Sequence, residues 1–166
     1  MSFAMIEALA IADSGPLIAL ARINRLALLP QLSSRILVPP EVWNEVTVHA
    51  IDAPGAREVS QAEWVEIMSP DPLLVGTLVI LVDRGEAEAI ALAQSFPGCL
   101  LLVDDARARR VAERLNVRRT GTVGLLRRAK QSGLIKSLRV EIEALQTNGI
   151  YIHQSLIDAV LQEVGE

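Results

Sequence analysis

The feature that most constrains the fold is a short apolar run that has to be buried on both faces. Residues 99–103 read Cys-Leu-Leu-Leu-Val and lead directly into Asp104-Asp105 and a basic amphipathic helix. A strand that is apolar throughout is typical of a parallel sheet covered by helices on both sides. The run therefore predicts an α/β fold, in which Cys99 is a buried apolar side chain.

The same alternation of strand and helix recurs along the chain. Residues 8–12 lead through Asp13-Ser14-Gly15-Pro16 into a helix for which Ser14 is the expected N-cap. Further strands are expected at 35–38, 64–68 and 117–119, and further helices at 41–48, 54–62, 73–82, 86–95, 123–131, 137–147 and 154–164. We predict a three-layer α/β/α sandwich with a central parallel sheet and a C-terminal helical extension over about residues 133–166.

Length and composition place a single domain over residues 1–166. With 51% hydrophobic and 22% charged residues, the chain can bury one substantial core. The apolar segment 73–82 fits a buried helix and is too short to span a bilayer, and the start of the chain lacks the basic segment of a secretory signal. We therefore expect a cytoplasmic protein that does not associate with membranes.

The net charge of −4 is unevenly distributed. Residues 104–139 contain eleven Lys or Arg and three acids, so this segment carries +8 and the remainder −12. A basic face can bind the phosphates of a nucleic acid even when the whole chain is acidic. Solvated helix faces produce the same pattern, so charge alone leaves both interpretations open.

Five acids lie at the ends of expected strands or on the helices that follow: Asp13, Glu45, Glu86, Asp104 and Asp105. Carboxylates gathered at one edge of a sheet repel one another unless a cation compensates their charge. The carboxyl ends of parallel strands are also where sites form in such sheets. Ligation by oxygen alone favours Mg²⁺ or Mn²⁺ over zinc, so the pattern indicates a hard-metal site.

Four of these five acids also have purely structural interpretations. Asp13 can be an ordinary polar residue in the turn before a helix. Glu45 can decorate a solvated helix face, although its apolar neighbours favour a half-buried position. Either Asp104 or Asp105 can be the N-cap of the following helix, and capping does not exclude metal binding.

Glu86 has the sharpest structural alternative. Asp83-x-x-Glu86 has the spacing of a capping box, in which the third helical residue bonds back to the cap. Glu88 is expected to point elsewhere and to be solvated. His49 and His153 lack metal-ligand spacing and are expected at the surface or behind the site.

The chain carries four motifs: Ile11-Ala-Asp13-Ser14, Val38-Pro-x-x-Val42-x-x-Glu45-Val46, Gly85-Glu86-Ala-Glu-Ala-Ile90 and Leu101-Leu-Val-Asp104-Asp105-x-Arg107. With these motifs the chain resembles the PIN domain family of metal-dependent nucleases. The segments Thr120-Gly121-Thr122-Val-Gly124 and Gly149-Ile-Tyr-Ile resemble one prokaryotic subfamily and extend the likeness over nearly the whole chain.

The resemblance implies a metal-dependent ribonuclease in which Asp13 is the central ligand. Glu45, Glu86 and Asp104 or Asp105 would complete the binding of one or two Mg²⁺ or Mn²⁺ ions. Some family members are toxins held inactive by an antitoxin protein. The chain departs from the commoner pattern at Glu86, where many members have aspartate, and at Val103, where many have Thr or Ser.

Substrate contacts are expected from side chains near this edge. Arg107, Arg110 and Arg114 follow the Asp pair and can hold RNA phosphates, as arginine does with two hydrogen bonds. Ser14, Thr120 and Thr122 are further candidates, the two threonines because they can cap a helix whose N-terminus binds a phosphate.

Two other functions stay open. The first is a catalytically weak or inactive module that keeps the fold and binds RNA or a protein partner. The second, a phosphotransfer domain, is disfavoured because Val117-Arg-Arg-Thr120 offers no lysine at a late strand end. The last two helices can cover the core or form an oligomer seam; we favour the cover, and we also expect a homodimer.

Overall fold

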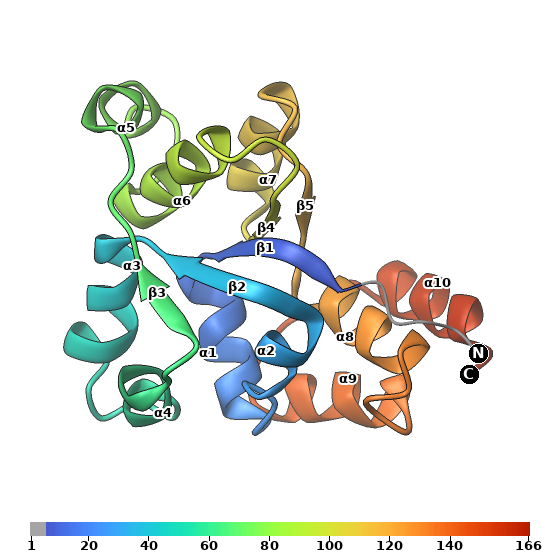
Figure 1. Ribbon diagram of the computed structural model, residues 1–166. Coiled ribbons are helices and arrows are strands. Elements are labelled where there is room, and N and C mark those ends of the chain that lie inside the picture. The colour runs from blue at the N-terminus through green and yellow to red at the C-terminus, as the bar shows by residue number, and fades with distance from the viewer. Residues whose placement is uncertain (1–5) are drawn as a thin grey trace.

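The computed structural model describes residues 6–166 and contains a five-stranded parallel sheet between layers of helices (Figure 1). The expected absence of a secretory signal concerns residues 1–10, of which residues 1–5 lie outside the described residues. The strands are β1 (Glu7–Ala12), β2 (Ser33–Val38), β3 (Val65–Ile67), β4 (Leu100–Leu102) and β5 (Arg119–Thr120). The predicted α/β class and parallel central sheet are confirmed.

The strand order β3-β2-β1-β4-β5 puts β1 at the centre of the sheet. Ala10 is in register with Ile36 of β2 on one side and with Leu100 of β4 on the other. The chain moves outward from β1 to β3 and then returns to place β4 on the opposite side. The crevice beyond the carboxyl ends of β1 and β4 is therefore the switch point at which open parallel sheets form their sites.

Helices cover both faces of the sheet because successive strand residues point to opposite sides. Ala10 and Ala12 face one cluster of buried residues, whereas Ile11 faces the other. The helices are α1 (Ser14–Arg22), α2 (Leu28–Leu32), α3 (Pro40–Asn44) with the π-helical turn η1 (Glu45–His49), α4 (Ala56–Gln61), α5 (Pro72–Leu78), α6 (Arg84–Gln94), α7 (Ala106–Arg114), α8 (Thr122–Gln131), α9 (Leu138–Thr147) and α10 (Gln154–Val164). Figure 1 shows α5, α6 and α7 above the sheet and α1, α2, α8 and α9 below it.

Two expectations about local structure are wrong. Helix α1 begins at Ser14, so Asp13 and not Ser14 occupies the N-cap position. The apolar segment 73–82 is not a buried helix, because α5 ends at Leu78 and both Leu73 and Ile80 are 81% exposed. Helix α5 packs on α6 through one side only, and apolar composition by itself does not distinguish a covered side from an uncovered one.

The last two helices cover the core, as the sequence favoured. Leu138, Ile142, Leu145 and Leu161 are buried in the same cluster as the strand residues that face α1. No helix within residues 6–166 has the length and apolar character needed to cross a bilayer.

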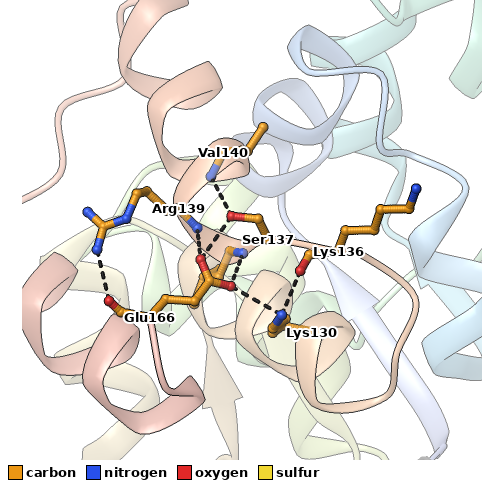
Figure 2. A network of polar contacts seen from close by, with 7 residues as sticks. Lys130, Lys136, Ser137, Arg139, Val140 and Glu166 are labelled. Carbon is orange, nitrogen blue, oxygen red and sulfur yellow. Dashed lines mark hydrogen bonds and ion pairs between the residues drawn. The ribbon is translucent and has the colours of Figure 1, made fainter.

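The carboxylate of Glu166 joins the end of this extension to its beginning (Figure 2). It accepts hydrogen bonds from the backbone N–H groups of Leu138 and Arg139 at 2.8 and 3.0 Å and from the Ser137 hydroxyl at 2.8 Å. The Lys130 ammonium lies 3.3 Å away. These donors, with the Arg139 N–H first, lower the pKa of Glu166 to about 2. A side chain beyond α10 thus caps two N–H groups in the first turn of α9, and the Ser137 hydroxyl caps the Val140 N–H at 3.2 Å.

Candidate functional site

Asp13 is the central residue of the acidic edge. It directly follows β1, and its backbone N–H donates to the carbonyl of Leu102 in β4 at 3.0 Å, which fixes it between the two strands. The residue is 5% exposed, and its Oδ1 is buried without a hydrogen-bond partner among the described residues. A buried carboxylate oxygen without a donor is unfavourable, so this atom needs a proton or a cation.

The electrostatics of Asp13 lead to the same requirement. Burial raises the pKa of Asp13 to about 7, and the backbone of Ser14 opposes this increase only in part. The neighbouring carboxylates of Glu86, Asp83 and Glu45 raise the pKa further. Below about pH 7 the protonated form of Asp13 is therefore favoured unless positive charge is supplied.

Glu45 approaches this edge from the first residue of η1. Its side chain is half-buried, as its apolar neighbours indicated, and burial raises its pKa while the Ser14 hydroxyl opposes the change. Gly85 makes room for it, since a Cβ at that position would lie 3.1 Å from Glu45 Cδ. The absent side chain of Gly85 lets the glutamate reach over the first turn of α6.

Glu86 takes part in the predicted capping box. Asp83 Oδ1 accepts from the Glu86 N–H at 2.8 Å, and Glu86 Oε2 accepts from the Asp83 N–H at 3.1 Å. Burial raises the pKa of Glu86 to about 7, with further increases from the carboxylates of Asp83 and Asp105. The capping bond uses Oε2 and leaves Oε1 available to a cation.

Asp104 and Asp105 accept hydrogen bonds from different helices. Asp105 is the N-cap of α7, and its Oδ1 accepts from the Ala108 N–H at 2.8 Å. Asp104 instead faces α8, where its Oδ1 accepts from the Thr122 N–H at 2.7 Å and its Oδ2 from the Thr122 hydroxyl at 2.6 Å. A Cβ on Gly15 would lie 3.7 Å from Asp104 Oδ2, so this carboxylate also adjoins the first turn of α1.

The five acids lie at one edge of the sheet, but their carboxylates do not converge on one point. Asp13 interacts electrostatically with Glu45 and Glu86, and Glu86 with Asp105. Across residues 6–166, no three His, Cys, Asp or Glu side chains converge as metal ligands do. The donor chemistry nevertheless fits a hard divalent ion, because every candidate atom is a carboxylate oxygen and Asp13 Oδ1 has no other partner.

Sequence reasoning overlooked two contributors to this edge. Asp83 was assigned only to the capping box, yet its carboxylate raises the pKa of Asp13, Glu45 and Glu86. Gly85 was noted only within a motif, and its role became visible through the approach of Glu45. The spacing Asp83-Arg84-Gly85-Glu86 at the start of a helix was the available signal for both.

The expectation that Glu88 is solvated is wrong. The residue is 7% exposed, burial raises its pKa, and its closest cationic partner is Arg84 at 4.0 Å. Helix α6 packs against α3, α5, α7 and β1, so its sides are covered well beyond the site. His49 and His153 are exposed, and His153 is the N-cap of α10, in agreement with a surface position.

A family model described as a PIN domain matches residues 9–166. The chain belongs to the PIN domain family. The suspected resemblance is thereby confirmed. PIN domains are generally nucleases, hence hydrolases, and typically use divalent metals. A search of curated proteins gives no match to this chain.

The four arginines of helix α7 in this PIN domain lie on different sides of the helix. Arg107, Arg110 and Arg114 line a groove of about 370 Å³ with Leu78 and Leu81, and none of the five acids lines it. Arg109 points away from that groove and lines a second one, of about 410 Å³, which includes Asp104. The second groove also includes the threonines expected to contact substrate, Thr120 and Thr122, which are 8% and 3% exposed.

Proposed function

We propose that this PIN domain is a metal-dependent ribonuclease that hydrolyses phosphodiester bonds of RNA with Mg²⁺ or Mn²⁺. The observation that carries the proposal is Asp13 Oδ1, a buried carboxylate oxygen without a partner, surrounded by further carboxylates at the switch point of the sheet. Such an atom stabilises no part of the fold by itself. It is well suited to a bound cation, and membership of a family that generally cuts nucleic acid supports the assignment.

In this proposal Asp13 is the central ligand, and Glu45, Glu86 and Asp104 or Asp105 complete the binding directly or through water. A divalent ion at such a site activates water and offsets charge on the phosphate. The chain itself fixes the orientation of one of the carboxylates. Thr122 holds Asp104 through its N–H and its hydroxyl, which fixes the orientation of that carboxylate.

RNA is the proposed substrate because residues 104–139, which carry +8, include α7 and α8 beside the acidic edge. The finer proposal is a cytoplasmic toxin of a toxin-antitoxin pair, which acts as a homodimer and is held inactive by an antitoxin protein. Co-purification of a neighbouring gene product and analytical ultracentrifugation test these two points separately.

The central test is cleavage of single-stranded and structured RNAs with Mn²⁺ and with EDTA. Asp13→Asn keeps the shape of the side chain and removes its charge, and the exposed Asp52→Asn is the matched control. We expect cleavage with Mn²⁺ by the wild type and by Asp52→Asn, and a loss of at least about a hundredfold in Asp13→Asn, in the range for removing a group on which water activation depends. Cleavage that persists in EDTA or in Asp13→Asn would refute the metal-nuclease proposal.

A second candidate is a binding module without catalysis. It is favoured by the engagement of three carboxylates elsewhere: Glu86 in the capping box, Asp105 at the N-cap of α7 and Asp104 on Thr122. In that case no RNA is cut, Mn²⁺ gives no heat of binding in calorimetry, and RNA still binds with a strong dependence on salt.

A further inference from the structure

The groove beside Asp104 has the size and lining of a nucleotide site. Its volume is about 410 Å³, within the range of small-molecule pockets. One wall is the start of α8, which carries Thr122, and the other is the segment before α10, which carries Tyr151. Because Asp104 lines this groove, it opens directly beside the acidic edge.

The guanidinium groups of Arg109, Arg119 and Arg127 line the groove, and two of them form ion pairs with exposed glutamates. Arg119 Nη2 pairs with Glu113 at 3.3 Å and Arg127 Nη1 with Glu163 at 2.9 Å, and those glutamates are 66% and 50% exposed. Ion pairs with such exposed partners contribute little to stability, so a phosphate can replace them. Arg109 has no ion pair within residues 6–166, and it is the guanidinium most available to a ligand.

Arg109 also reaches the part of the groove that adjoins the acidic edge. Its Nη1 is 3.4 Å from the position that a Cβ on Gly121 would occupy, which places it over the first turn of α8. A Cβ at position 121 would lie 2.7 Å from Asp104 Oδ1, so the glycine leaves room for the Asp104 carboxylate beside the start of α8. The Asp104 carboxylate already accepts the Thr122 N–H at this helix end, so a phosphate in the groove would be held by the guanidinium groups and not by the helix.

Tyr151 supplies the second half of a nucleotide site. It is the single tyrosine of the chain, lines the same groove and is 84% exposed. An aromatic ring that the fold does not bury is available to stack on a base, and every base offers such a face.

We propose that this groove binds one nucleotide of a single-stranded RNA next to the cleaved bond. Arg109 holds its phosphate, with Arg119 and Arg127 beside it, and Tyr151 stacks on its base. The inference rests on the proposed function for the identity of the substrate. It differs from the sequence-based expectation for Arg107, Arg110 and Arg114, whose groove does not include an acid of the site.

Neighbouring arginines on α7 give a matched comparison. Arg109 and Arg110 are both exposed and carry the same charge, but they line different grooves. The measurement is the fluorescence anisotropy of a labelled heptauridylate titrated with the full chain in EDTA, where no cleavage takes place. We expect Arg109→Ala to weaken binding about tenfold and to reduce the salt slope by about one, and Arg110→Ala to change the affinity less than about twofold.

The stacking half is tested with Tyr151→Ala and Tyr151→Phe. We expect the alanine variant to weaken binding about tenfold and the phenylalanine variant to bind like the wild type, because the ring and not the hydroxyl contacts the base. Circular dichroism shows whether each variant is folded. Photo-crosslinking of a 5-iodouridine oligonucleotide should label Tyr151.

Equal losses in Arg109→Ala and Arg110→Ala, an unaffected Tyr151→Ala, or the absence of RNA binding in EDTA would each overturn the inference. The outcome is separable from that of the proposed function. Binding that depends on Arg109 and Tyr151 without any cleavage in Mn²⁺ supports the groove and refutes the nuclease. Cleavage that depends on Asp13 but is indifferent to Arg109 and Tyr151 does the reverse.

Discussion

Replacing Asp13 by asparagine should stabilise the metal-free protein at neutral and alkaline pH. The carboxylate is buried, and its Oδ1 is without a partner among the described residues, so its ionisation opposes folding. The pKa of Asp13 is raised from 3.8 to about 7, mainly by burial. An amide of the same shape carries no charge and can donate to the carboxylates around it.

The magnitude follows from the linkage between pKa and stability. A pKa of about 7 in the folded chain against 3.8 in the unfolded chain lowers the free energy of unfolding by about 4 kcal/mol above pH 7. Because the folded pKa is the higher one, the folded state loses no stability from Asp13 below pH 3.8, and the loss grows to its full value as the pH rises through about 7. Relaxation of the site reduces the measured difference, so we expect Asp13→Asn to gain about 1 to 4 kcal/mol at pH 8, or roughly 3 to 12 °C in Tm.

The assay is urea denaturation in EDTA from pH 5 to 8, followed by circular dichroism, with Asp52→Asn as the exposed control. Adding Mn²⁺ at 100 times its Kd should stabilise the wild type by about 2.7 kcal/mol and leave Asp13→Asn unchanged. A variant less stable than the wild type at pH 8 in EDTA, or a stability difference independent of pH, would refute the reasoning about the buried carboxylate.

Two further predictions concern residues at the acidic edge, and a third concerns Glu7 at the other end of β1. Gly85→Ala should abolish the stabilisation by Mn²⁺ because the new Cβ displaces Glu45, while the free energy of unfolding in EDTA changes by less than about 1 kcal/mol; unchanged Mn²⁺ binding would contradict this. Thr122→Val should lower the free energy of unfolding by about 1 to 2 kcal/mol and reduce cleavage, because Asp104 Oδ2 loses its hydroxyl donor, and Thr122→Ser should retain both properties in urea and cleavage assays. Glu7 pairs with Arg118 at 2.8 Å and with Arg128 at 2.7 Å, and these arginines lower the pKa of Glu7 from 4.5 to about 2. Glu7→Gln should therefore destabilise the protein by about 1 to 2 kcal/mol at pH 7, allowing for the exposure of the two arginines. In acid titrations this difference in stability should disappear as the pH falls through about 2.

Much of the site's local chemistry could be predicted from short stretches of sequence. The capping box needs only the spacing of Asp83 and Glu86, and the position of Asp13 needs only the end of an apolar strand. The burial of Glu88 could not be predicted, because it depends on how many elements pack around α6. The exposure of Ile80, which follows the end of α5, likewise depends on which segments pack around it.

The arginines of α7 show the same limit at the level of a single helix. The sequence identified a basic helix after Asp104 and favoured Arg107, Arg110 and Arg114, but which groove each side of a helix faces is set by its neighbours. Consecutive helical residues point about 100° apart, so Arg109 and Arg110 separate once β5 and α8 lie on one side and α5 on the other. The metal-ligand roles of the acids and the substrate contacts stay predictions.

By itself, the sequence determined the alternation of apolar strands and amphipathic helices, the acids at the strand ends and the concentration of positive charge after residue 104. These properties depend on periodicity and on local bonding, which a chain carries in its order of residues. Only the tertiary structure decided that Asp13 is buried with a carboxylate oxygen left unpartnered, and that Asp104 turns away to Thr122. Burial and solvation are properties of the assembled layers, because the atoms that exclude water from Asp13 come from segments far apart in the chain.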